Sequence, residues 1–235
     1  MSVKPTVCRV SMVPSGDTAS RKAELFDSIR RSLQKAELQH LNAIEISIVH
    51  SCYDPQMFTA LVGFGGGLPG FLERLNEDPL HIQQFKMGEG DVIFDQSFHG
   101  LTQLYDPTVD STEITADVVA ITGLDGHAYG SWSGGNPKRM WLRDFLSEDL
   151  PKCRVMVYGY NSKLSNPGLH TIEDFGRGLR EELLQVRRSD KVASRPYHID
   201  RVLVLTILGT KETNNFRCTQ LWRNYPNQCL SCLYP

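Results

Sequence analysis

Three apolar runs of strand length lie in the second half of the chain, and the segments between them constrain the fold more than any other feature. The runs are "DVVAI" at 117–121, "CRVMVYGY" at 153–160 and "RVLVLTIL" at 201–208. Between the last two lies "TIEDFGRGLREELLQVRRSD" at 171–190, where apolar residues recur at helical spacing. Strands that alternate with helices predict an α/β fold with a parallel sheet and crossover helices.

The segment at 171–190 carries the clearest helical pattern in the chain. Its apolar stripe consists of Ile172, Phe175, Leu179, Leu183 and Val186. Thr171 with Asp174 resembles a capping box, and two arginines follow at the negative end of the helix dipole. The segment "KRMWLRDFL" at 138–146 predicts a further, shorter helix.

A glycine-containing loop, "TGLDGHAYGSW", follows the first of these strands. An open parallel sheet binds ligands beyond the carboxyl ends of its strands, and a glycine loop there can turn backbone N–H groups toward a developing oxyanion. The candidate residues are Gly123, Leu124, Asp125, Gly126 and His127, and the first two are placed for the oxyanion role. The alternative is a tight turn whose glycines only satisfy backbone dihedral angles. The spacing matches neither of the common phosphate-binding glycine motifs.

Several residues around this loop suggest chemistry but favour a structural interpretation. His127 resembles a catalytic base, yet a histidine after such a loop more often packs or hydrogen-bonds locally. Asp125 is interpreted as a solvated turn residue rather than a substrate contact. The remaining candidates are interpreted as two surface carboxylates, two core tryptophans and a histidine without an evident partner: Asp144, Asp149, Trp132, Trp141 and His99.

The first half of the chain predicts a smaller module over residues 5–95. Strand-like runs at 7–13, 43–49, 58–64 and 91–98 surround a helical segment at 18–38 and a short one at 68–77. This β-α-β-β-α-β order is that of a ferredoxin-like α+β module. Residues 96–115, rich in Asp, Thr and Pro, are expected to form a connecting loop.

RNA-recognition modules share that order of elements, and they stack bases on aromatic residues of the third strand. When "MFTALVGF" is aligned to their pattern, Thr59 and Leu61 occupy the stacking positions, and only Val62 and Phe64 match. The first strand offers Cys8 where an aromatic residue is needed. The net charge of −2 adds no general attraction for nucleic acid. We therefore expect an interaction module and no nucleic-acid partner.

Composition and cysteine content limit the number of domains, the cellular compartment and the cofactors that can be expected. The 235 residues, 22% charged and 40% hydrophobic, suffice for one large domain or two small ones. Neither a secretory signal nor an apolar run long enough for a membrane span is present, so we expect an intracellular, cytoplasmic protein with reduced thiols. Cys229-x-x-Cys232, with Cys218 as the one nearby thiol, falls short of the four ligands typical of zinc. We expect neither a metal nor an organic cofactor.

Four segments together resemble successive motifs of the fungal SERAC1-like hydrolases, which are serine esterases or lipases of the α/β-hydrolase fold. They are "FHGLTQLYDP", "DVVAITGLDGHAYGSW", "WLRDFLSEDLPKCRVMVYGYNSKL" and "TIEDFGRGLREEL". The resemblance covers residues 95–196, and similar domains head some fungal NOD-like receptors. It implies hydrolysis of a carboxylic ester, with a lipid or other ester as substrate. It also allows mitochondrial or endoplasmic-reticulum association.

The resemblance stops where the catalytic serine is expected. In that family the long helix is followed by Arg-Pro, an apolar strand and a G-H-S-x-G-G elbow that carries the nucleophile. This sequence reaches Arg195-Pro196, but no G-x-S-x-G occurs in it. Ser133 in "GSWSGG" lies in the wrong loop, and the elbow position in "LGTKET" is Lys211.

The sequence therefore predicts the N-terminal half of an α/β-hydrolase domain over 116–196, with a divergent C-terminal tail over 197–235. We expect no catalytic residue in this truncated form and little or no esterase activity. The alternative is a non-catalytic interaction or signalling module. A sheet of at most four strands, one of them from near residue 92, is expected to leave strand residues partly exposed, among them Val119, Ile121, Val155, Val157, Leu203, Leu205 and Ile207.

Overall fold

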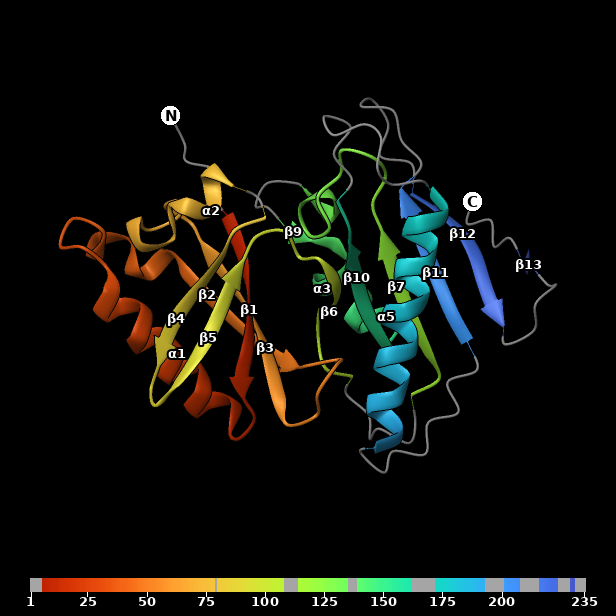
Figure 1. The fold of residues 1–235 in the computed structure, drawn as a ribbon, viewed down its shortest axis with the longest axis horizontal. Helices are drawn as coiled ribbons and strands as arrows, with labels where there is room; N and C mark the ends of the chain where they lie inside the picture. Colours follow the sequence, from red (N-terminus) through yellow and green to blue (C-terminus); the bar gives the residue numbers. More distant parts are fainter. Residues whose placement is uncertain are drawn as a thin grey trace. The chain divides into compact units, whose positions relative to one another are not determined.

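The computed structural model describes residues 6–78, 80–107, 114–134, 139–161, 172–192, 201–207, 216–223 and 229–230 (Figure 1). The chain divides into two compact units, Met1–Ser97 and Phe98–Pro235. Each unit contains its own sheet. Both combine helices and strands, so the chain is a mixed α/β protein.

The first unit is built on a five-stranded antiparallel sheet with the strand order β2-β3-β1-β5-β4. The strands are β1 (Thr6–Pro14), β2 (Ile44–His50), β3 (Met57–Phe64), β4 (Ile82–Met87) and β5 (Gly90–Asp95). The long strand β1 lies at the centre, between β3 and β5. Arg9 on β1 lies opposite Asp95 on β5, and their side chains form a 2.8 Å ion pair.

Buried apolar residues that alternate along the central strands form a hydrophobic core on one face of this sheet. Helix α1 (Thr18–Ser32) begins at Asp17, whose carboxylate accepts the backbone N–H of Ser20 over 2.8 Å. Leu25 and Ile29 of α1 are fully buried in the same core as Val10 and Phe94 from the strands. Apolar positions therefore repeat with the helical period in α1 and with a period of two residues in the strands that it packs against.

The predicted helix at 18–38 is too long, because α1 ends at Ser32. Leu33 is extended, with φ −73° and ψ 139°, and a 3₁₀ helix η1 (Leu38–Ala43) follows. The predicted short helix at 68–77 is divided into η2 (Gly70–Leu72) and α2 (Arg74–Glu77). Strand β4 was not predicted, because its sequence, "IQQFKM", is largely polar and exposed. At the compared stacking positions of β3, Leu61 is buried and Thr59 is half-buried.

The second unit is built on a six-stranded mixed sheet with the order β13-β12-β11-β7-β10-β6. The strands are β6 (Gly100–Gln103), β7 (Ala116–Ile121), β10 (Cys153–Gly159), β11 (Arg201–Ile207), β12 (Phe216–Arg223) and β13 (Cys229–Leu230). Only the central pairs β10–β7 and β11–β7 are parallel. The outer pairs are antiparallel.

The sheet corrects several expectations. The expected parallel sheet is limited to three central strands, and β6 lies within the segment expected to be a connecting loop. The strand near residue 92 belongs to the first unit, whereas β12 and β13 extend the second sheet beyond four strands. Val119, Val155 and Val157 are fully buried instead of partly exposed. Ile121 and Leu205 are half-buried.

Helix α5 (Ile172–Val192) confirms the helix predicted from the apolar stripe. It packs against β6 of the same unit. Thr171, the expected capping residue, lies outside the described residues. The helix predicted at 138–146 is confirmed only in part. Its first residues form β9 (Arg139–Met140), which pairs with β8 (Ser133–Gly134), and two single helical turns follow, α3 (Trp141–Asp144) and α4 (Leu146–Asp149).

Candidate functional site

The glycine loop follows β7, the strand that has a parallel neighbour on each side (Figure 1). Thr122 is buried at the end of the strand, and the chain then emerges into solvent. Gly123 and Asp125 are exposed, and the Leu124 side chain is 55% exposed. The structure therefore presents the predicted loop at the carboxyl end of a central parallel strand, where α/β sheets bind ligands.

The loop is a tight turn that requires glycine at one position. The N–H of Gly126 donates a 3.1 Å hydrogen bond to the carbonyl of Gly123. A Cβ atom at Gly126 would lie 2.7 Å from Cβ of Thr122 and 2.8 Å from that carbonyl oxygen. Asp125 adopts a positive φ of 57°, a conformation that aspartate tolerates better than most residues. Gly126 thus serves the fold of the turn, whereas Gly123 and Leu124 remain accessible for a ligand.

Tyr160, which the sequence analysis did not single out, fixes the base of the loop. Its hydroxyl donates a 2.8 Å hydrogen bond to the carbonyl of Thr122. Its ring stacks on Tyr158 at 5.9 Å and contacts Phe175 of α5 at 4.6 Å between centroids. Burial raises the pKa of Tyr160 above its ordinary value, so the hydroxyl keeps its proton and remains a donor at neutral pH. The sequence signal for this role was the alternating aromatic pair Tyr158 and Tyr160 at the end of "RVMVYGY".

His127 has a local structural role in the turn. Its Nδ1 accepts the backbone N–H groups of Tyr129 at 3.2 Å and Gly130 at 2.9 Å, at the start of the 3₁₀ helix η4 (Gly130–Trp132). In neutral imidazole the proton is then on Nε2. Its own backbone N–H donates to Oγ of Ser131 at 2.9 Å. His127 therefore acts as a cap for the turn, in agreement with the local role favoured from the sequence.

Phe98, just before the edge strand β6, lies in close contact with Gly159 at the end of β10. Phe98 is fully buried at a φ of 52°, and its ring stacks on Tyr129 with centroids 5.3 Å apart. A Cβ atom at Gly159 would overlap the carbonyl oxygen of Phe98, so only glycine fits there. His99 is exposed and forms a backbone bridge with Gly159.

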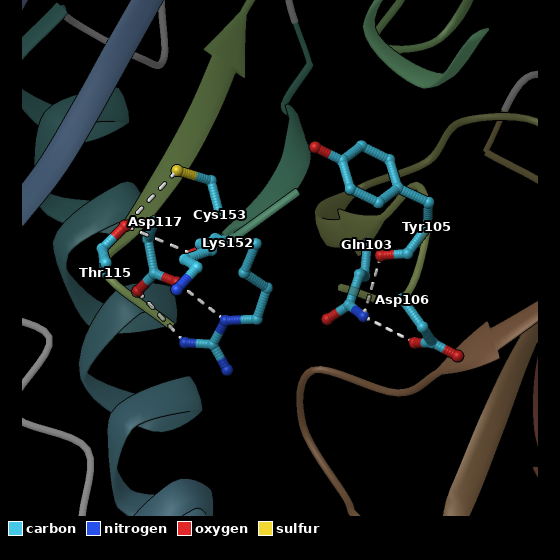
Figure 2. A network of polar contacts seen from close by, with 8 residues as sticks. Gln103, Tyr105, Asp106, Thr115, Asp117, Lys152 and Cys153 are labelled. Atoms are coloured by element: carbon cyan, nitrogen blue, oxygen red, sulfur yellow. Dashed lines mark hydrogen bonds and ion pairs between the residues drawn. The ribbon is translucent and has the colours of Figure 1, made fainter. Parts of the chain in front are cut away.

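A buried ion pair joins β7 and β10 near their N-terminal ends, which lie away from the loop. Nε and Nη2 of Arg154 donate to the two carboxylate oxygens of Asp117 at 2.7 and 3.0 Å. The two residues are direct neighbours in the parallel register of β10 and β7. Figure 2 shows this contact beside a second one, in which the Gln103 amide donates to Asp106 at 2.8 Å. Because Asp117 is the second residue of β7, the pair lies at the end of the sheet away from the loop.

The three cysteines whose side chains the structure describes are buried thiols. Cys8, Cys52 and Cys153 are buried. Burial, and to a lesser extent the Asp95 carboxylate, raise the pKa of Cys8 to about 12. Burial also raises the pKa of Cys153, whose sulfur lies 3.8 Å from the Thr115 hydroxyl (Figure 2). Since the thiolate is the reactive form, the thiols of Cys8 and Cys153 are poorly reactive.

The other residues singled out in the sequence have structural positions that differ from one another. Trp132 is buried as expected, whereas Trp141 is only half-buried. Asp144 accepts the backbone N–H of Met140 at 2.8 Å, and Asp149 is exposed at the end of α4. The hydroxyl of Ser133 donates to the carbonyl of Tyr129 at 3.4 Å.

Two features of the described ranges concern metal binding and membrane insertion. No group of three or more His, Cys, Asp and Glu side chains there is arranged to hold a metal ion. Among the described helices, none combines the length and the apolar character needed to cross a membrane. Lys211, at the expected elbow position, and Cys232 lie outside the described residues, and the side chains of Cys218 and Cys229 are not described.

Comparison with known proteins gives no match: no protein-family model, no curated protein and no solved structure is significantly similar to the chain. The likeness to SERAC1-like hydrolases therefore depends on the sequence motifs themselves.

Proposed function

We propose that the second unit is the oxyanion side of an α/β-hydrolase-type domain, from a lineage that hydrolyses carboxylic esters, and that this chain does not itself turn over esters. The observation that carries the proposal is the position of the glycine loop at a reversal of strand order. From β7 the chain continues to β10 on one side and then crosses to β11 on the other side. In open α/β sheets, ligands bind at such a switch point, outside the carboxyl ends of the strands.

The loop supports an oxyanion role through its accessibility and its fixed base. In α/β-hydrolases one oxyanion-hole N–H comes from a loop that follows an inner strand, and another from the residue after the nucleophile. Gly123 and Leu124 are exposed, whereas Thr122 before them is buried and held by Tyr160. A fixed backbone N–H at this place stabilises negative charge on a carbonyl oxygen without reorganisation of the loop.

Ester hydrolysis also needs a nucleophile, and the 235-residue sequence contains no G-x-S-x-G. Cys8, Cys52 and Cys153 are buried, and His127 uses Nδ1 to cap its own turn. These observations support binding of a carbonyl or carboxylate group without covalent chemistry. A lipid or another carboxylic ester remains the substrate class of the lineage. The proposal includes no metal and no organic cofactor.

We also propose that the first unit is a ferredoxin-like interaction module with one added edge strand. The order β2-β3-β1-β5, together with α1 after β1 and the short helices η2 and α2 after β3, supports this assignment. Strand β4 then pairs with the outer side of β5. Cytoplasmic localisation, with mitochondrial or endoplasmic-reticulum association as the alternative, remains a proposal.

The alternative function is a non-catalytic interaction or signalling module. The exposed side chain of Leu124 at the tip of the loop favours this possibility, because an apolar tip also suits a contact with a protein. The two functions differ in what the loop recognises: a carbonyl or carboxylate group through backbone N–H groups, or an apolar protein surface through Leu124.

Labelling with a fluorophosphonate probe, together with hydrolysis of short p-nitrophenyl esters, tests the proposed lack of turnover. We expect neither labelling nor hydrolysis above the rate of the heat-denatured chain. Labelling that disappears when a single serine is replaced would contradict the proposal and would identify a nucleophile. Serine-to-alanine changes at Ser131 and Ser133, both next to the loop, provide the first variants for that experiment.

A further inference from the structure

A pocket in the first unit lies between the chain after α1 and the glycine-rich end of β3. Its volume is about 240 Å³, and its walls include the apolar side chains of Leu33, Ile44, Phe64, Leu68 and Pro69. Cavities of about 150 Å³ lined by leucine, isoleucine and phenylalanine bind benzene. The pocket therefore has room for one aromatic ring or a branched alkyl group.

One wall consists of backbone, because residues 65–67 are all glycine. The N–H of Gly65 donates to the Ala43 carbonyl at 2.8 Å, and a Cβ atom at Gly65 would lie 3.3 Å from that oxygen. Gly67 has a φ of 88°, which disfavours any side chain. Two of the three glycines are thus required by the backbone, and the pocket stays open beside them.

Glu37 places a fixed negative charge in the same pocket. Its two carboxylate oxygens each accept one backbone N–H, from Gly70 and from Gln34, both at 2.7 Å. The residue is half-buried. Among the salt bridges between described residues, none includes Glu37. Because a carboxylate offers about four acceptor sites, both oxygens keep the capacity to accept a further donor.

We propose that this pocket binds a small organic cation, specifically a primary ammonium group on a short aromatic or branched alkyl stem. The stem occupies the apolar part of the pocket, and the ammonium group donates to the Glu37 carboxylate. The apolar walls alone would accept a neutral ligand, but the fixed carboxylate favours one with a positive charge. This site lies wholly within the first unit and is independent of the function proposed for the glycine loop.

Titration of the full chain, labelled with ¹⁵N at glycine, provides the test. Benzylammonium is the probe, and benzyl alcohol and benzoate are its neutral and anionic counterparts. We expect benzylammonium to shift the amide signals of Gly65, Gly66, Gly67 and Gly70 in a saturable manner. Benzyl alcohol should bind about tenfold more weakly, because its neutral hydroxyl can donate to Glu37 but lacks the positive charge that strengthens the hydrogen bond, and benzoate should not bind.

Glu37→Gln is the direct variant, and Glu77→Gln removes the same charge from an exposed position on α2 of the same unit. We expect Glu37→Gln to weaken benzylammonium binding about tenfold and to leave benzyl alcohol unaffected, while Glu77→Gln changes neither. A thermal melt shows whether Glu37→Gln folds. If it does not fold, the comparison of the three probes on the unaltered chain decides the question.

Two results would overturn the proposal. Equal binding of benzylammonium and benzyl alcohol would show an apolar pocket that does not select a cation. No saturable shift of the four glycine signals with any of the three probes would show that the cavity binds no ligand of this class.

Discussion

The hydroxyl of Tyr160 donates a hydrogen bond to the carbonyl of Thr122 over 2.8 Å, and this bond links the ends of two parallel strands. Thr122 is the last buried residue before the exposed glycine loop. The ring of Tyr160 is in turn held by Tyr158 and by Phe175 of α5. The conformation of the loop therefore depends on the neighbouring strand and on the long helix, and not only on the loop's own glycines.

Replacement of Tyr160 by phenylalanine removes that hydrogen bond and keeps the ring. We expect the free energy of unfolding to fall by about 1 kcal/mol, the usual net contribution of one such bond. We also expect faster hydrogen exchange at residues 123–126 than in the unaltered chain. Tyr158→Phe, on the same strand, is the control for the loss of a phenol. Unchanged exchange in the loop of Tyr160→Phe would contradict the positioning role.

Alanine at Gly126 introduces a Cβ atom 2.7 Å from Cβ of Thr122, in a turn that has no room for it. We expect a loss of about 1–3 kcal/mol in the free energy of unfolding, as for other overpacked sites. Urea denaturation measures the loss. Gly134→Ala is the matched control, since a Cβ atom there has no neighbour within 4 Å. Similar stabilities for the two variants would show that the turn adapts easily.

Removal of one partner from the ion pair of Arg154 and Asp117 leaves the other charge buried. The two side chains are only 6% and 1% exposed. We therefore expect Asp117→Asn to lower the free energy of unfolding by about 3–5 kcal/mol. The double variant Asp117→Leu with Arg154→Met should recover most of this loss, because it leaves no unpaired charge. Equal losses in the single and double variants would contradict this account.

Because the thiol of Cys8 is buried, we expect the stability of the chain to depend on pH in the alkaline range. Its pKa is raised from 9.0 to about 12 in the folded chain, mainly by burial. The unfolded chain therefore loses this proton first, so the contribution is complete below pH 9 and is lost as the pH rises toward 12. Between these values the unaltered chain should lose more stability than Cys8→Ala, measured by urea denaturation. Parallel pH profiles for the two chains would contradict the assignment.

The sequence predicted the elements whose periodicity is strong and local. Helix α5 and the central strands β7, β10 and β11 agree with the predicted segments, since their apolar patterns depend only on neighbouring residues. The edge strands β4 and β6 were missed because edge positions do not require a continuous apolar run. The segment at 138–146 has helical composition, yet its residues Arg139 and Met140 form β9, which pairs with β8.

At the candidate site, the sequence indicated the loop but not the groups that hold it. Glycines in a turn, and the strand before them, can be recognised from the sequence alone. The bond from Tyr160 to Thr122 joins residues 38 positions apart, and the Arg154–Asp117 pair joins residues 37 apart. Both depend on the parallel register of β7 and β10, which the sequence does not specify.

Binding of an anion by the glycine loop can be measured by NMR at the backbone N–H of Leu124 while a short alkyl carboxylate or phosphonate is added. We expect a saturable shift of the Leu124 signal. Leu124→Ala keeps this N–H and should still bind the anion, whereas Leu124→Pro removes it and should not. No shift at Leu124, or equal anion binding by Leu124→Ala and Leu124→Pro, would contradict an oxyanion role and leave the glycines as turn residues only.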